Sequence, residues 1–194
     1  PEKYSYEIDF SLLFFSLLAL LFFIPNLLYK LIFGYQGTAN FIPHLFESDF
    51  FVYYALGLPL GHLLSILGMN IAVNGDMLGF ENLESGLFTY VVIAKSCSGI
   101  TSIQVFLSAL ISYLWIENHL FKSESIYIIS LATLACYFAN IVRMAVIVFI
   151  GHIYGIDSMK FVHEYLGWVF FSLVIFVFWS FLPQRLMTIH SGET

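Results

Sequence analysis

Charged residues are scarce in this chain of 194 residues, which holds only 7 lysines and arginines and 13 aspartates and glutamates. With 10% charged and 60% hydrophobic residues, the chain lacks the polar surface that a water-soluble globule of this length needs. The net charge of −6 argues against nucleic acid as a partner. The sequence therefore predicts an integral membrane protein that does not bind nucleic acid.

Cysteine is scarce as well. The 2 cysteines, Cys97 and Cys136, cannot form a disulfide framework. Cys136 lies deep in an apolar stretch, where a packing role is expected. No metal site and no cofactor are predicted.

Long apolar runs occupy most of the chain. A helix needs about 20 apolar residues to cross a membrane, so there is room for about five or six spans and no separate soluble domain. We therefore predict a single transmembrane domain over residues 1–194. The expected spans are residues 10–33, 50–68, 98–116, 126–150 and 161–182, with a polar loop over 151–160. The second span is expected to bend at Gly57, Pro59 and Gly61.

The segment between the second and third spans has the pattern of strands. Residues 69–73, the turn signal Asn74-Gly75 and residues 76–80 predict a hairpin, and residues 87–93 are β-branched and aromatic enough for a third strand. The predicted fold is thus an all-α polytopic membrane protein. A small β-hairpin or three-stranded cap is expected at one end of its bundle, directly before Cys97.

Cys97 lies where this cap passes into a long apolar helix. The amide N–H groups and the dipole of a helix N-terminus favour an anion, and Lys95 adds a positive charge two residues earlier. A thiol at such a place has a lowered pKa and acts as a nucleophile. The alternative is that small residues simply begin a membrane helix, and taken alone this alternative is slightly preferred.

Counting the spans gives a test of the nucleophile hypothesis. Five crossings place the N-terminus, the segment before Cys97 and the loop before His163 on one side of the membrane. Arg143 lies seven residues before the end of its span, which at about 1.5 Å per residue puts it roughly 10 Å below that side. A long arginine side chain can extend towards the interface, so it can reach the same pocket.

These three residue types form a set for acyl transfer. Cysteine and histidine supply a nucleophile and a general base or acid, and arginine can stabilise an oxyanion. A buried arginine is costly in a membrane and indicates function by default. The alternative for Arg143 is a structural ion pair with Glu164 or Asp157.

The same segments resemble the exosortase/archaeosortase family of membrane transpeptidases. The resemblance rests on three short motifs in family order: Ser96-Cys97-Ser98-Gly99-Ile100, Asn140-Ile141-Val142-Arg143-Met144 and Phe161-Val162-His163-Glu164.

The resemblance implies a sortase-like cysteine peptidase and transpeptidase of the plasma (inner) membrane, with its site on the extracytoplasmic side. Its substrates would be surface-destined proteins whose C-terminus carries a short motif, a transmembrane helix and a basic tail. The substrate would pass to a lipid or another acceptor. Cys97 would be the nucleophile, Arg143 would stabilise the reacting carbonyl and His163 would move protons. The supporting candidates are Lys95, Ser98, Asn140 and Glu164, and Glu164, Asp157 or Asn140 would orient His163.

Two other classes of function stay open at this point. A non-catalytic membrane protein could bind haem or a metal through intramembrane histidines such as His62 and His152. An assembly subunit could instead use Arg143 to pair with an acid in the membrane span of a partner.

Overall fold

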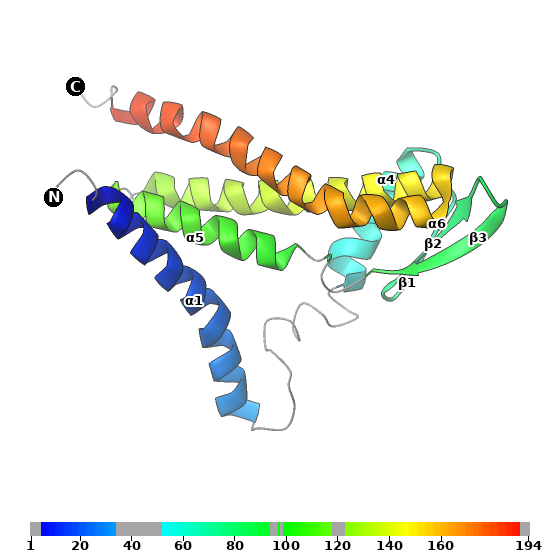
Figure 1. Cartoon of the computed structure of the whole chain (residues 1–194), viewed down its shortest axis with the longest axis horizontal. Helices are drawn as coiled ribbons and strands as arrows, with labels where there is room; N and C mark the ends of the chain where they lie inside the picture. The colour runs from blue at the N-terminus through cyan, green and yellow to red at the C-terminus, as the bar shows by residue number, and fades with distance from the viewer. Residues whose placement is uncertain (1–4, 34–51, 94–96, 98, 118–122, 191–194) are drawn as a thin grey trace.

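A computed structural model describes residues 5–33, 52–93, 97, 99–117 and 123–190 (Figure 1). The side chains of residues 25, 26, 28–33, 123, 124 and 181–190 are outside that description. The described chain is mostly helical and includes one small sheet. Its elements are helix α1 (Ser5–Phe33), the π-helix η2 (Val52–Gly57) continuing into α4 (Leu58–Ile66), strands β1 (Ile71–Asn74), β2 (Met77–Asn82) and β3 (Leu87–Val92), and helices α5 (Ile100–Ile116) and α6 (Ser123–His190).

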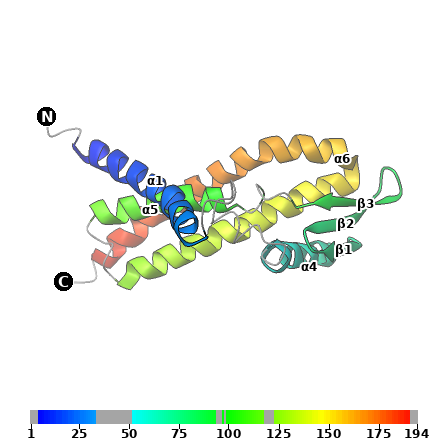
Figure 2. The same ribbon diagram turned by 90° about the horizontal axis from the view of Figure 1, so that it is seen from below.

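Helix α6 folds back on itself. Gly155, with φ 81° and ψ 174°, is the point where its two halves meet, and both views show them running side by side (Figures 1 and 2). The other residues of the predicted polar loop, 151–160, are helical. The predicted loop is therefore wrong, because a single glycine outside the helical region of φ and ψ is enough to reverse the chain.

Among the described residues, two helices are long and apolar enough to cross a membrane, by length and composition. They are Ser5–Ile24 in α1 and Ser125–Ser180 in α6, which doubles back at Gly155. The helices Val52–Ile66 and Ile100–Ile116 are apolar but shorter. These helices fit a membrane protein, and the count of five or six spans stays a prediction.

Helix α1 runs antiparallel to α5. The Tyr6 hydroxyl donates a hydrogen bond of 2.9 Å to Glu117 Oε1, just after the C-terminal end of α5. Further along, the Gln104 side-chain amide donates one of 3.4 Å to the Leu21 carbonyl. The start of α1 therefore lies at the opposite end of α5 from Cys97 (Figure 1).

The prediction, by contrast, put the N-terminus at the same end as Cys97. The prediction counted residues 50–68 as a crossing span. Helix α4 instead lies beside the sheet, across the long axis of the bundle, and is seen nearly end-on in Figure 2. With one fewer lengthwise helix, the N-terminus moves to the other end of the bundle.

The three strands form an antiparallel meander in the order β1-β2-β3. The first turn falls one residue later than the predicted Asn74-Gly75 pair. Asn74 still pairs with Met77, so Gly75 and Asp76 make the turn, and Gly75 takes a φ of +61°. The predicted strands are present, and the position of the sheet outside the membrane stays a prediction.

Two glycines of the η2–α4 segment serve close packing. A Cβ atom at Gly57 or Gly61 would stand 2.9 or 2.7 Å from a methyl group of Val73. These positions therefore let β1 lie directly against α4. A bend was predicted at the same glycines, and the chain does change from a π-helix to an α-helix between Gly57 and Leu58.

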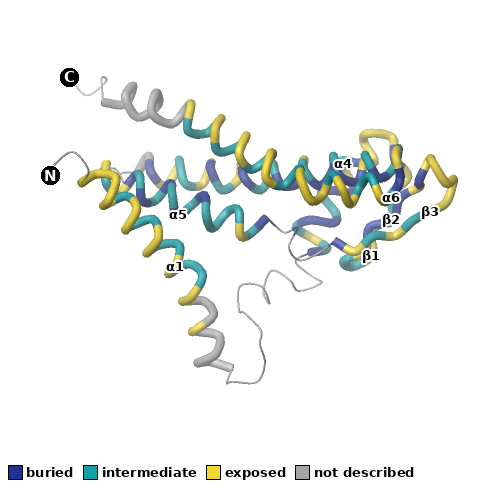
Figure 3. Tube along the Cα trace, in the orientation of Figure 1, coloured by how far each residue is buried: buried dark blue, intermediate teal, exposed yellow. Residues whose placement is uncertain are grey.

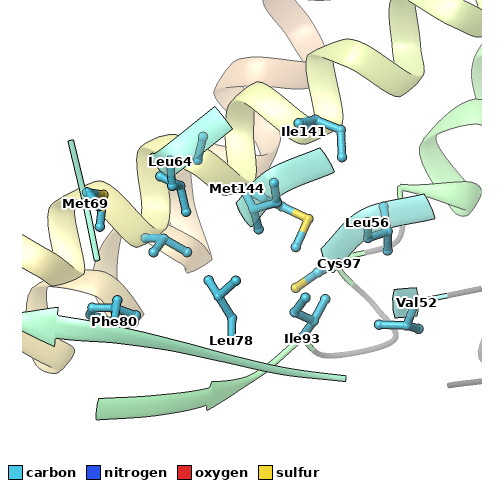
Figure 4. Packing of buried hydrophobic residues seen from close by; sticks show 13 residues of the cluster. Val52, Leu56, Leu64, Met69, Leu78, Phe80, Ile93, Cys97, Ile141 and Met144 are labelled. Carbon is cyan, nitrogen blue, oxygen red and sulfur yellow. The ribbon is translucent and has the colours of Figure 1, made fainter. Parts of the chain in front are cut away.

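Two hydrophobic clusters hold the chain together. The first joins η2, α4, the sheet and the first half of α6, and it contains Cys97 (Figure 4). The second lies between α5 and α6 and contains Cys136. Figure 3 shows the contrast with α1, whose described side chains are exposed or only partly buried. The packing role expected for Cys136 agrees with its 8% exposure in the second cluster.

Candidate active site

The structure brings Cys97 and His163 into contact across 66 residues of sequence. Cys97 Sγ lies 3.6 Å from Nε2 of the His163 ring and 3.9 Å from Nδ1. Cys97 lies on the segment that joins β3 to α5, and His163 lies in the second half of α6. The reversal of α6 at Gly155 carries the histidine back along the bundle to the thiol.

The backbone at Cys97 is held from the side by Asn140. The Asn140 amide Nδ2 donates a hydrogen bond of 2.9 Å to the Cys97 carbonyl oxygen, and the Asn140 side chain is buried. Gly99, the residue before α5, has a φ of +74°. A Cβ atom there would stand 2.7 Å from Asn140 Cγ. Glycine at position 99 therefore permits both the left-handed backbone and the close approach of the amide.

Sequence reasoning assigned Asn140 a different task, as one of three candidates to orient His163. The structure places its amide on the Cys97 backbone. The signal available in the sequence was that Asn140 and Arg143 are three residues apart and so share a face of the helix. That spacing identifies a polar face, and the partner of the amide depends on how α5 packs against α6.

Arg143 lies close to this pair but lines a different, smaller cavity. That cavity has a volume of about 30 Å³ and is bordered also by Gly99, Asn140 and Gly167. A Cβ atom at Gly167 would be 3.4 Å from Arg143 Nη1. Because Gly167 is four residues after His163, both lie on the same face of α6, and the guanidinium reaches that face one helical turn beyond the histidine.

Arg143 carries a donor with no partner in the described structure. Its Nε atom is buried and forms no hydrogen bond to any described residue. The proposed ion-pair partners do not supply one. Asp157 lies on the exterior, 3.7 Å from Lys160, and Glu164 is exposed. In the part of the chain that the structure describes, the structural ion pair predicted as an alternative is not formed.

A larger cavity lies directly against the thiol. Its volume is about 210 Å³, and Cys97, Lys160 and His163 form part of its wall. The rest of the wall is apolar and comes from α4, β2, β3 and α6. Figure 4 shows the Cys97 side chain beside three of these residues, Leu78, Ile93 and Met144. A substrate group bonded to the sulfur would therefore have space beside it.

Two of the supporting candidates fall outside the described structure, and the two histidines considered for haem lie on α4 and α6. Lys95 and Ser98 lie outside the described residues. Of the two histidines considered for haem, His62 is exposed on α4, and the His152 ring contacts the Glu81 carbonyl oxygen through Nδ1. Within the described ranges, no group of three or more histidine, cysteine, aspartate or glutamate residues is placed to hold a metal ion.

Comparison with known families adds one finding. A family model described as "Transmembrane exosortase (Exosortase_EpsH)" matches residues 59–180. The match spans more than half of the chain and includes Cys97, Arg143 and His163. No curated protein and no solved structure matches the chain.

Proposed function

The chain belongs to the transmembrane exosortase family, and from this premise we propose that it is a cysteine transpeptidase of the plasma (inner) membrane. The proposed substrates are surface-destined proteins with a C-terminal motif, a transmembrane helix and a basic tail. The enzyme cleaves at the motif and passes the new C-terminus to a lipid or another acceptor. Its site faces the extracytoplasmic side.

One observation carries this proposal. The sulfur of Cys97 lies within 3.6 Å of an imidazole nitrogen of His163. A thiol beside an imidazole can transfer its proton to the ring, which produces the thiolate nucleophile and an imidazolium acid. Contact between the two side chains is what a cysteine peptidase requires and what a packing role for Cys97 would not need.

In the first half of the reaction, the thiolate attacks the carbonyl carbon of the scissile peptide bond and a C–S bond forms. The tetrahedral intermediate collapses, and the C–N bond breaks. The leaving amine takes the proton that His163 holds. The products are a thioester on Cys97 and a released C-terminal fragment that begins with a new amino group.

In the second half, the acceptor attacks the thioester carbonyl. His163 accepts the proton of the acceptor nucleophile as the new bond forms. The C–S bond then breaks and the thiolate of Cys97 is restored. Atoms and charges balance over the two halves, so the exchange needs neither an oxidant nor a reductant.

Asn140 and Arg143 are proposed to support the two reacting groups. Asn140 fixes the backbone that carries the nucleophile through its hydrogen bond to the Cys97 carbonyl. The unpartnered Nε of Arg143 is a donor for a developing oxyanion once substrate is bound. Its guanidinium lies next to the face of α6 that presents His163. Asn140 is thus a positioning residue, and Arg143 is the proposed electrostatic stabiliser.

The test is processing of a co-expressed membrane protein that carries such a C-terminal signal, followed by mass spectrometry of its new C-terminus. Wild-type enzyme should shorten the substrate and leave an attached acceptor group. Cys97→Ala and His163→Gln should leave it full-length at equal expression. Cys136→Ser is the matched control and should process normally, because that thiol packs in the second cluster. Full activity of Cys97→Ser would overturn the assignment of the nucleophile.

A further inference from the structure

We infer that the cavity of about 210 Å³ beside Cys97 is a specificity pocket for one apolar side chain of the substrate. The side chain belongs to the residue whose carbonyl carbon the thiolate attacks. This inference rests on the proposed function and extends it to the chemistry of the sorting motif.

The wall of the cavity determines what it can hold. It is built from aliphatic side chains on four elements, among them Leu60 of α4, Leu78 of β2, Val91 of β3 and Val148 of α6. Leu60 and Leu78 are fully buried. Lys160 and His163 also border the cavity, but the Lys160 ammonium is exposed and lies 3.7 Å from Asp157, and the His163 ring contacts Cys97. A carboxylate or an amide placed among the aliphatic side chains would lose its water without gaining a hydrogen bond, which is unfavourable. The pocket therefore selects an aliphatic or aromatic group.

The volume of the cavity fits a single such group. An engineered apolar cavity of about 150 Å³ is large enough to bind benzene. A cavity of about 210 Å³ therefore accommodates a branched aliphatic side chain or a phenyl ring. Because Cys97 itself forms part of the wall, a side chain one carbon away from the attacked carbonyl reaches the cavity directly.

The sheet gains a role from this arrangement. Val91, Val92 and Ile93 line the cavity and come just before Cys97 in the sequence. Leu78 of β2 lines it too and pairs with Val91 across the sheet. The same three-stranded unit thus delivers the nucleophile and forms one wall of the pocket, so a change in the sheet alters which side chain is accepted.

The test uses two defined alkylating probes on full-length protein in detergent micelles. Iodoacetamide and N-benzyl-iodoacetamide each form a C–S bond with Cys97 and expel iodide, and the thiol proton is lost to the imidazole or to water. A Cys136→Ser background leaves Cys97 as the one thiol. The measured quantity is the rate with the benzyl probe divided by the rate with iodoacetamide, which removes differences in the intrinsic reactivity of the thiol.

Two variants fill the pocket from different walls, Val91→Phe and Val148→Phe. Thr89→Phe is the matched control, because Thr89 is also half-buried on β3, on the same face as Val91, and does not line the cavity. The rate ratio should be about tenfold higher in the parent and in the control than in the filled variants, since transferring a ring from water to an apolar pocket has about that effect. All four proteins share the same micelles, so partition of the benzyl probe cancels.

An equal rate ratio in all four proteins would contradict the proposed specificity pocket. So would a ratio equal to that of the parent in whichever of the two filled variants folds. Failure of the proposed function has a different signature. In that case wild-type enzyme would leave the substrate full-length or Cys97→Ala would still process it, while the probe ratio would continue to report the shape of the cavity.

Discussion

Gly99→Ala is the substitution for which the structure gives the sharpest expectation. Alanine at a φ of +74° is strained by about 1–2 kcal/mol. The added methyl group would also stand 2.7 Å from Cγ and 3.0 Å from both terminal atoms of the Asn140 amide. The amide must therefore move and release the Cys97 carbonyl, which costs about 1–3 kcal/mol more when a buried polar group loses its partner.

Gly86→Ala is the matched control. Gly86 has a similar φ of +66°, and nothing lies within 4 Å of a Cβ atom built there. Its destabilisation should therefore reflect backbone strain alone. Thermal unfolding of the two variants in detergent measures the difference, and the rate of Cys97 alkylation by iodoacetamide reports the position of the thiol. Gly99→Ala should melt lower than Gly86→Ala, and its thiol should react at an altered rate.

A double-mutant cycle isolates the contact with Asn140. In an Asn140→Ala background the added methyl group has space, so Gly99→Ala should cost only what Gly86→Ala costs. The reasoning is refuted if Gly99→Ala and Gly86→Ala are equally stable and equally reactive. It is also refuted if the two substitutions at positions 99 and 140 are simply additive.

Substitutions at three positions test the supporting groups. Asn140→Asp keeps the shape but removes the donor, so both the melting temperature and the rate of Cys97 alkylation should change; an unchanged rate would limit Asn140 to a structural role. Arg143→Lys should lower processing by about 10²-fold or more, because an ammonium lacks the planar set of donors; normal processing by this variant would exclude Arg143 from the chemistry. Gly167→Ala should be tolerated and Gly167→Val should impair processing, because a Cβ atom already reaches 3.4 Å from Nη1 of Arg143; equal activity of the two would show that the guanidinium does not need this space.

Local patterns in the sequence were sufficient to predict the three strands of the sheet and to identify the family. Alternation and turn residues identified the three strands, with an error of one residue at Gly75. The family resemblance, which rested on three short motifs, is confirmed by the match over residues 59–180. Both results depend on residues that are neighbours in the chain, where propensity and spacing act directly.

The contacts between distant segments were harder to predict. The predicted end of the bundle for the N-terminus differs from the structure because the apolar stretch Val52–Ile66 was counted as a helix that runs along the bundle. Composition does not distinguish a short helix packed on a sheet from a membrane span. Similarly, the hydrogen bond from Asn140 to the Cys97 carbonyl requires the amide to pass close to Gly99, where the backbone is left-handed. The sequence marks that position only as a glycine.

The proximity of Cys97 and His163 was predicted by the same count and is present in the structure. This part of the prediction agrees with the structure because it uses only α5 and the two halves of α6, all of which run along the bundle (Figure 2). Its conclusion did not depend on the misread helix. The catalytic roles of the two residues stay a prediction.

The central claim is that Cys97 carries the substrate as a thioester, and peptide mapping of enzyme co-expressed with substrate tests it most directly. Enzyme isolated during turnover should yield a Cys97 peptide whose mass is increased by the acyl fragment of the substrate. Neutral hydroxylamine, which cleaves thioesters, should remove that mass, and His163→Gln should not accumulate it. Processing of substrate by a Cys97→Ala enzyme, or an acyl group found on another residue, would contradict the account.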